Sequence, residues 1–442
     1  MKVLMFGWEF PPFNTGGLGT ACYGLTKGLA NNNVDVTFVV PQMPEKVNAE
    51  FVKLISAKSY GKANIKFRMV KTPLAGYMTP EEYKVKTALL TNVPDGQQKL
   101  YGDNIFMEAQ IYAEKAAEIA KTEPHDVIHA HDWMTYMAGL AAKKVSGKPL
   151  VVHVHATEFD RGGGNGVNQA VYDLERKGMH EADAICSVSE FTKNKIIEHY
   201  GVDPNKINVV HNAVEFNDHK FVKESFGLSR DSKVVLFLGR ITLQKGPEYF
   251  LYAAKKVLEQ DPNIKFVVAG TGDMHGMMIE KAAELGIGEN VLFTGFLKGK
   301  DIDKAYQMAD LYVMPSVSEP FGITPLESMR NNTPVLISKQ SGVSEVVNHV
   351  LKVDFWDVDK MANQICAILK YGELHNALME NGNKEVQNFS WNIPAEKCLH
   401  VYNKLLENKL INNNLNKTEN FKSLKNLNQV KDLFYSINRG VN

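Results

Sequence analysis

Residues 234–246 read V-V-L-F-L-G-R-I-T-L-Q-K-G, an apolar run followed by a glycine loop that carries Arg240 and Lys245. A short apolar run without polar alternation is typical of a strand that helices cover on both faces, as in parallel α/β sheets. Ligands of such sheets bind at the carboxyl ends of the strands, where this loop would lie. Two cations there predict a diphosphate site, since arginine binds two oxygens at once. A solvated basic loop is the alternative.

Similar runs rich in Val, Ile and Phe recur along the chain. In the first half they are 3–6, 36–40, 127–130, 151–154, 184–188 and 208–210, and in the second half 234–238, 266–269, 291–294, 311–314 and 335–338. Helix-length amphipathic stretches such as 104–121 and 248–258 separate them. The pattern predicts an α/β fold of two tandem, Rossmann-like, doubly wound domains that face each other across a cleft.

The pattern restarts near residue 233, after a polar stretch that has no clean period. We therefore predict an N-terminal domain at 1–218 and a C-terminal domain at 219–388. An amphipathic helix at 389–408 is expected to pack back toward the N-terminal domain. The tail at 409–442 is rich in Asn and Lys, a composition typical of a flexible segment.

Composition limits the class of protein. The 442 residues carry a formal net charge of +0, which gives no sign of a nucleic-acid partner. The chain starts without a signal-peptide pattern, and no run reaches the roughly 20 apolar residues of a membrane span. We therefore expect a cytoplasmic protein whose membrane contact is at most peripheral. The cysteines show no paired spacing and are interpreted as buried thiols: Cys22, Cys186, Cys366 and Cys398.

Two glycine-rich loops follow predicted strands. Residues 11–19 read P-P-F-N-T-G-G-L-G, and Gly16 and Gly17 would let helix N–H groups cradle a diphosphate, with a plain strand-to-helix turn as the alternative. Residues 270–276 read G-T-G-D-M-H-G, where a histidine interrupts the dinucleotide fingerprint. Gly270 is therefore expected to line a nucleotide pocket only through its backbone.

Residues 316–328 read S-V-S-E-P-F-G-I-T-P-L-E-S and contain two acids around a turn. Thr324 and Glu327 have the spacing of a capping box, with Pro325 in the first helical turn. Glu319 has no such structural explanation. Gly322 would expose N–H groups to an anion, and an acid beside a phosphate site would bind something else, with sugar hydroxyls the natural partner.

The histidines of I-H-A-H-D-W (128–133) and H-V-H (153–155) recur two positions apart, hence on one face of a strand. A zinc hydrolase could use this spacing together with a distant Asp, but the chain lacks the single eight-fold strand–helix cycle that such hydrolases usually have. Most of these histidines are interpreted as hydrogen-bonded core or strand-end residues. Asp132 and His155 are the exceptions, because they lie at strand ends that would open on the cleft.

Taken in order, P-P-F-N-T-G-G-L-G, H-A-H-D-W, H-A-T-E, G-R-I-T-L-Q-K-G and E-P-F-G-I-T-P-L-E resemble the retaining GT-B glycosyltransferases of family 4, with glycogen and starch synthases as near relatives. The resemblance covers about residues 1–408. It implies an acceptor-side N-terminal domain and a C-terminal domain that binds a nucleotide sugar. It also implies transfer of a hexose, with glucose favoured, from a UDP- or ADP-sugar to a hydroxyl acceptor such as an α-glucan, without metal or cofactor.

The resemblance also assigns roles to residues. Arg240 and Lys245 would hold the leaving diphosphate, Glu319 and His155 would contact the donor sugar, and Asp132 would lie near the acceptor; these form the expected catalytic set. Glu327 would bind the ribose. The expected donor-binding set is Gly16, Gly17, Gly239, Arg240, Lys245, Gly270, Phe321, Gly322, Ile323, Thr324 and Glu327.

One departure argues against glycogen synthesis from ADP-glucose. Asn14 stands where bacterial glycogen synthases carry a lysine, so one diphosphate contact is lost. The stretch 155–164 still resembles glucosyltransferases, which places Arg161 near the site, and its glycine run is expected to form a mobile acceptor loop. The alternatives are a lipid or cell-envelope glycan acceptor, a nucleotide-sugar 2-epimerase, a nicotinamide dehydrogenase and a non-catalytic sugar-nucleotide sensor.

Overall fold

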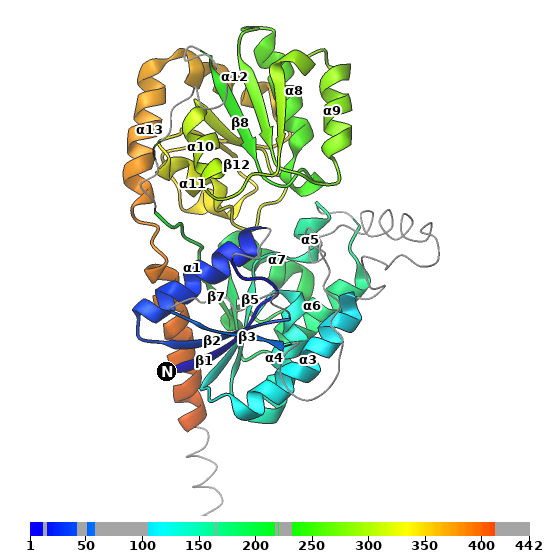
Figure 1. The fold of residues 1–442 in the computed structure, drawn as a ribbon, viewed down its shortest axis with the longest axis vertical. Helices are drawn as coiled ribbons and strands as arrows, with labels where there is room; N and C mark the ends of the chain where they lie inside the picture. Colours follow the sequence, from blue (N-terminus) through cyan, green and yellow to red (C-terminus); the bar gives the residue numbers. More distant parts are fainter. Residues whose placement is uncertain are drawn as a thin grey trace, which may run out of the picture.

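The computed structural model describes residues 1–11, 16–41, 51–57, 105–163, 166–216, 220 and 232–411. Two lobes are stacked along the long axis of the molecule, and each is built on one parallel sheet (Figure 1). Most of the predicted linker, residues 58–104 and the residues beyond 411 lie outside the described residues. Among the described residues, no helix is both long and apolar enough to cross a bilayer.

The N-terminal sheet has the strand order β3-β2-β1-β4-β5-β6-β7. Its strands are β1 Lys2–Phe6, β2 Asp35–Val40, β3 Lys53–Ser56, β4 Val127–His131, β5 Leu150–Val154, β6 Ala184–Ser187 and β7 Ile207–Val209. Its helices are α1 Gly17–Asn31, α3 Ile105–Thr122, α4 Trp133–Ser146, α5 Glu158–Arg161, α6 Gln169–Glu181 and α7 Glu190–Tyr200, with the 3-10 turn η3 Pro204–Lys206. Separate hydrophobic clusters cover the two faces of this sheet.

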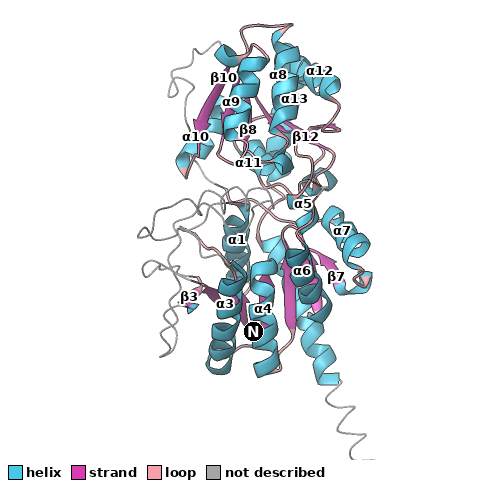
Figure 2. Ribbon diagram, turned by 90° about the vertical axis from the view of Figure 1, so that its right-hand side faces the viewer, coloured by secondary structure: helices cyan, strands magenta, loops and turns pink. Residues whose placement is uncertain are grey.

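The C-terminal sheet has the order β10-β9-β8-β11-β12-β13. Its strands are β8 Val234–Leu238, β9 Lys265–Ala269, β10 Val291–Gly295, β11 Leu311–Met314, β12 Val335–Ser338 and β13 Leu351–Val353. Its helices are α8 Pro247–Leu258, α9 His275–Glu284, α10 Lys300–Met308, α11 Thr324–Arg330, α12 Val358–Lys370 and α13 Gly372–Val386, with 3-10 turns η5 Leu243–Lys245, η6 Gly288–Asn290 and η7 Gly342–Glu345. This sheet is also covered on both faces, as Figure 2 shows for its helices and strands.

Every apolar run that the sequence pattern marked as a strand is a strand. The pattern missed β3 and β13, which are the outer strands at one end of each sheet. The side chains of β3 are exposed or half-buried, and β13 reads L-K-V. An edge strand has only one neighbour and less cover, so it lacks the apolar signature of the central strands.

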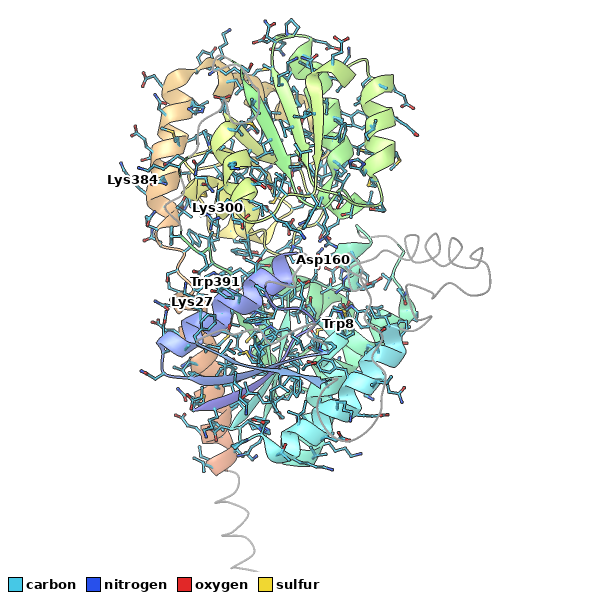
Figure 3. The ribbon with its side chains drawn as sticks, in the orientation of Figure 1. Trp8, Lys27, Asp160, Lys300, Lys384 and Trp391 are labelled. Carbon is cyan, nitrogen blue, oxygen red and sulfur yellow. The ribbon has the colours of Figure 1, made fainter. Side chains whose placement is uncertain are left out.

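A C-terminal helix, residues 392–411, returns to the N-terminal lobe and packs on the same face as α1 (Figure 1). Trp391, labelled in Figure 3, is 4% exposed and lies directly against α1. A Cβ at Gly24 would come within 2.1 Å of the Trp391 ring, and one at Gly28 within 2.3 Å of its carbonyl oxygen. Two glycines of α1 therefore form the surface on which the start of this helix rests.

Trp391→Ala should lower the free energy of unfolding by about 3–5 kcal/mol, because it leaves a cavity between α1 and the C-terminal helix. Trp356 is 59% exposed, so Trp356→Ala is the matched control and should change stability by less than about 0.5 kcal/mol. Urea unfolding followed by circular dichroism measures both. Equal shifts in the two variants would contradict this account of the α1 contact.

Candidate active site

The site is built where the carboxyl ends of both sheets meet. All strand pairs in the described residues are parallel, so each sheet has its carboxyl ends along one edge. Side chains from the N-terminal lobe contact the segment after β11, which shows that the two edges face each other. The expected site residues of both lobes lie in the segments that follow these strand ends.

The loops after β8 and β9 touch through their backbones. Gly270 has φ +141°, and a Cβ there would lie 1.8 Å from the carbonyl oxygen of Gly239, so only glycine fits. The N–H of Gly239 donates to Ala269 at 3.0 Å, and that of Gly270 donates to Gly295 at 2.8 Å. These two glycines therefore shape the loops, and their N–H groups already have backbone acceptors.

Lys245 and Glu319 are paired. Lys245 follows β8 and is half-buried, Glu319 follows β11 and is 6% exposed, and the ammonium forms an ion pair with the carboxylate. Ser316 also donates to the same carboxylate at 3.2 Å. Glu319, for which the sequence indicated no structural role, is thus the partner of Lys245, the cation expected to hold a diphosphate. Arg240 lies half-buried in the same loop as Lys245.

The segment after β11 is fixed by backbone bonds within its own lobe. Glu319 donates its N–H to Gln340 at 3.0 Å, and its carbonyl accepts from Gly342 at 2.9 Å. Phe321 is 2% exposed, and Gly322 has φ +99°, a value that favours glycine. Ile323 packs against hydrophobic clusters of both lobes.

The predicted capping box at the start of α11 is wrong. Thr324 is the first helical residue, the preceding Ile323 is the N-cap, and no side chain caps the helix. Thr324 instead accepts a hydrogen bond from Tyr312 at 2.8 Å, and Glu327 accepts one from Tyr306 at 3.2 Å. Burial raises the pKa of Glu327. The hydroxyls of the two buried tyrosines have no water as a partner. They therefore bond to the side chains of Thr324 and Glu327, which then do not cap the helix.

On the N-terminal side, Asp132 fixes the backbone around His155. Asp132 is buried, and its carboxylate accepts the N–H of His155 at 2.7 Å and of Ala156 at 3.4 Å. Its φ of 61° and ψ of 167° fall in a region that is essentially restricted to glycine. Such strain clusters at functional sites. Asp132 therefore positions His155 rather than opening on a cleft as an exposed acid.

Three histidines of β4 and β5, together with His155 just after β5, form a stack at this point. The rings of His129 and His153 are 5.3 Å apart and inclined by 4°, and His131 Nδ1 lies 3.0 Å from His155 Nε2. Burial lowers the pKa of all four, that of His155 to about 3. His129, His131 and His153 are buried core residues, as predicted, but both ring nitrogens of His153 lack hydrogen-bond partners among the described residues.

The histidine stack approaches several thiols closely enough to raise the question of a metal. Ligand atoms lie within 4.8 Å of one another in three groups: His129, His131 and His153; Cys22, His131 and His155; and His153, Cys186 and Cys398. A histidine lone pair lies in the plane of its ring. The parallel rings of His129 and His153 therefore do not point at one ion, and the group of three histidines does not fit a metal site.

The carboxylate of Glu9 accepts a hydrogen bond at the N-terminus of α1, next to the glycine loop. Gly16 is the N-cap, Gly17 begins the helix, and the N–H of Gly19 donates to Glu9 at 2.8 Å. A Cβ at Gly17 would meet no described atom within 4 Å. Glu9 therefore occupies part of the helix N-terminus that the sequence pattern assigned to an anion, while Asn14 lies outside the described residues.

Arg161 is buried in the N-terminal lobe, where the carboxylates of Glu175, Glu158 and Asp132 raise its pKa. It is 3% exposed and donates to Glu158 at 3.0 Å and Glu175 at 2.9 Å. Burial raises the pKa of Glu175 to about 7 despite this pairing. Two buried carboxylates thus hold Arg161 inside the lobe, and its place near the site stays a prediction.

Contacts between the lobes include a triad that sequence reasoning missed. Asp160 of α5, Lys195 of α7 and Ser318 after β11 bond to one another at 2.6–2.7 Å. Asp160 lies where the lobes meet (Figure 3) and is completely buried. The T-x-x-D spacing of Thr157 and Asp160, which form a capping box, was the available signal.

Two family models match the chain. One, described as Glycosyltransferase Family 4, covers residues 15–218, and the other, Glycosyl transferases group 1, covers residues 218–385. The protein is a family 4 glycosyltransferase with the GT-B fold. An uncharacterized glycosyltransferase of Methanocaldococcus jannaschii is 31% identical over 425 residues, which are 92% of this chain and 99% of that protein.

Other relatives extend this assignment. The glycogen synthase of Mycobacterium tuberculosis is 25% identical over 78% of this glycosyltransferase and 80% of its own length. The structure of Anabaena HepE in complex with UDP and glucose has a TM-score of 0.66 and 16% identity, and the match covers 91% of this chain and 100% of that one. That likeness confirms the predicted fold.

The histidine stack should make the glycosyltransferase sensitive to mild acid. The unfolded chain binds protons on these histidines below pH ~6.5, whereas the folded chain does not until much lower pH, so stability falls as pH falls. Each such group contributes up to ~1.4 kcal/mol per pH unit. His153→Leu should therefore flatten the loss of unfolding free energy between pH 6.5 and 5.5, as measured by urea unfolding.

His349→Leu, which alters an exposed histidine, is the control and should keep the wild-type slope. Opposing contributions cancel in this comparison, including that of Glu175, because both variants retain them. A His153→Leu slope equal to that of the control would show that the stack does not govern acid stability.

Proposed function

We propose that this protein is a retaining, metal-independent hexosyltransferase that moves glucose from a UDP- or ADP-sugar to a hydroxyl acceptor. The observation that carries the proposal is the pairing of Lys245 with Glu319 where the ends of β8 and β11 meet. Arg240 of the same loop adds a second cation. HepE, which shares the fold, was solved with UDP and glucose, and this supports a sugar nucleotide as donor.

The electrostatics suit a diphosphate leaving group. Breaking the anomeric C–O bond places positive charge on the sugar and negative charge on the diphosphate, whose oxygen keeps the electron pair. Lys245 and Arg240 would stabilise the diphosphate, and such preorganised charges are usually the largest catalytic contribution. Because Glu319 already partners Lys245, the carboxylate would lie beside the diphosphate, where it can accept hydrogen bonds from the sugar hydroxyls.

In the proposed reaction, the acceptor hydroxyl attacks the anomeric carbon from the face that the diphosphate leaves. Its proton passes to a phosphate oxygen of the leaving diphosphate. Because attack and departure occur on the same face, the anomeric configuration is retained without a protein nucleophile. His155 would contribute as a neutral hydrogen-bonding group, since burial keeps its pKa near 3. One of its ring nitrogens faces His131, which leaves the other for the sugar.

An α-glucan is the proposed acceptor class, in keeping with the glycogen synthase relative. A lipid or cell-envelope glycan is the alternative, and Asn14 in the first glycine loop argues for a departure from ADP-glucose chemistry. A thermal-shift panel of UDP-, ADP- and GDP-glucose identifies the donor. Product analysis by NMR in the presence of EDTA then tests retention, metal independence and the acceptor, and an inverted product would overturn the mechanism.

Lys245→Ala and Arg240→Ala should each lower turnover by about 100- to 1000-fold, because each removes charge that stabilises the leaving diphosphate. Release of UDP from UDP-glucose, with and without an oligoglucan acceptor, measures the effect. Lys255→Ala is the control, because its side chain on α8 is 41% exposed and forms a long ion pair with Glu259 at 3.8 Å. Turnover near the wild-type rate in both site variants would remove these residues from the mechanism.

A further inference from the structure

We infer that the N-terminal lobe positions Glu319 for catalysis, through Asp160 and Lys195 on one flank of this acid and Ser189 and Thr192 on the other. This inference rests on the proposed role of Glu319. Asp160, Lys195, Ser189 and Thr192 are positioning residues: each acts on the reaction through the backbone of the donor-site segment.

The first flank is Ser318. Its hydroxyl donates to Asp160 Oδ1 at 2.7 Å and accepts from Lys195 Nζ at 2.6 Å, while Lys195 also donates to the same carboxylate oxygen at 2.6 Å. The other oxygen of Asp160 accepts the N–H and hydroxyl of Thr157, both at 2.8 Å. The carboxylate is thus held by its own lobe, and Ser318 is the group that it orients.

The second flank is Pro320. Its carbonyl accepts from Ser189 at 2.5 Å and from Thr192 at 3.2 Å, and both hydroxyls belong to the first turn of α7. A proline fixes its own φ and restricts the residue before it to extended conformations. The backbone of Glu319 is therefore fixed between two residues that the opposite lobe binds.

The packing leaves little room for adjustment. A Cβ at Gly342 would lie 2.5 Å from Ser189 Cβ, so the two lobes approach closely beside Glu319. Glu345 of η7 strengthens the contact by accepting the N–H groups of Glu190 at 2.9 Å and Phe191 at 2.6 Å, at the start of α7. The backbone around Glu319, the acid that would bind the sugar, is thus fixed only when the two lobes are in contact.

The test compares Ser318→Ala and Lys195→Met with wild type in steady-state release of UDP from UDP-glucose, with ADP-glucose in parallel. Both variants should lower kcat by about 10- to 100-fold, since a displacement of about 1 Å has that effect. The donor KM should change by less than about threefold, because Arg240 and Lys245 remain to hold the diphosphate. Ser318→Thr retains the hydroxyl and should restore kcat.

Lys193→Met is the matched control: it lies on the same helix, pairs with Glu190 at 3.6 Å and should leave kcat unchanged. The double variant Lys195→Met/Ser318→Ala should have a kcat no lower than that of the less active single variant, because both substitutions act through one segment. An unchanged kcat in Ser318→Ala, or an equal loss in Lys193→Met, would overturn the inference. Glu319→Gln separates the two hypotheses: full activity there refutes the proposed function, whereas its inactivity with an active Ser318→Ala refutes only the positioning.

Discussion

The Glu319 backbone is constrained from both lobes at once, and the rest of the site depends on this constraint. Within its own lobe the N–H and carbonyl of Glu319 are bonded to Gln340 and Gly342. The neighbours on either side, Ser318 and Pro320, are bonded to side chains of the other lobe. Because its backbone is fixed, Glu319 pairs with Lys245 in one position and does not move with the lysine side chain. An electrostatic site requires such preorganisation.

Parallel topology explains why such a meeting occurs. In each sheet the loops that follow the strands lie at one edge, and the two sheets face each other with these edges together. On the N-terminal side the edge rests on a buried histidine stack, where Asp132 in a strained conformation directs the chain at His155. The C-terminal lobe therefore contributes the ion pair of Lys245 and Glu319, while the N-terminal lobe contributes His155 and the buried carboxylates of Asp132 and Asp160.

The sequence predicted the central strands and the loops of the site because both have local signatures. An apolar run marks a strand covered on both faces, and a loop after such a strand lies at the ligand edge. The capping-box error has a different cause from the missed edge strands. Thr324 and Glu327 have capping-box spacing but bond to Tyr312 and Tyr306. There a buried partner from elsewhere in the chain replaced the local one.

The sequence by itself determined the parallel α/β lobes, the cationic loop after β8 and the acid after β11, because these follow from composition and position along the chain. Only the tertiary structure decided that Lys245 pairs with Glu319, 74 positions away, and that Asp160 binds Ser318, 158 positions away. Partners at such separations leave no periodic trace. These pairs form because polar groups that become buried need a hydrogen-bond partner. A buried polar group without one costs more free energy than a hydrogen bond contributes to stability.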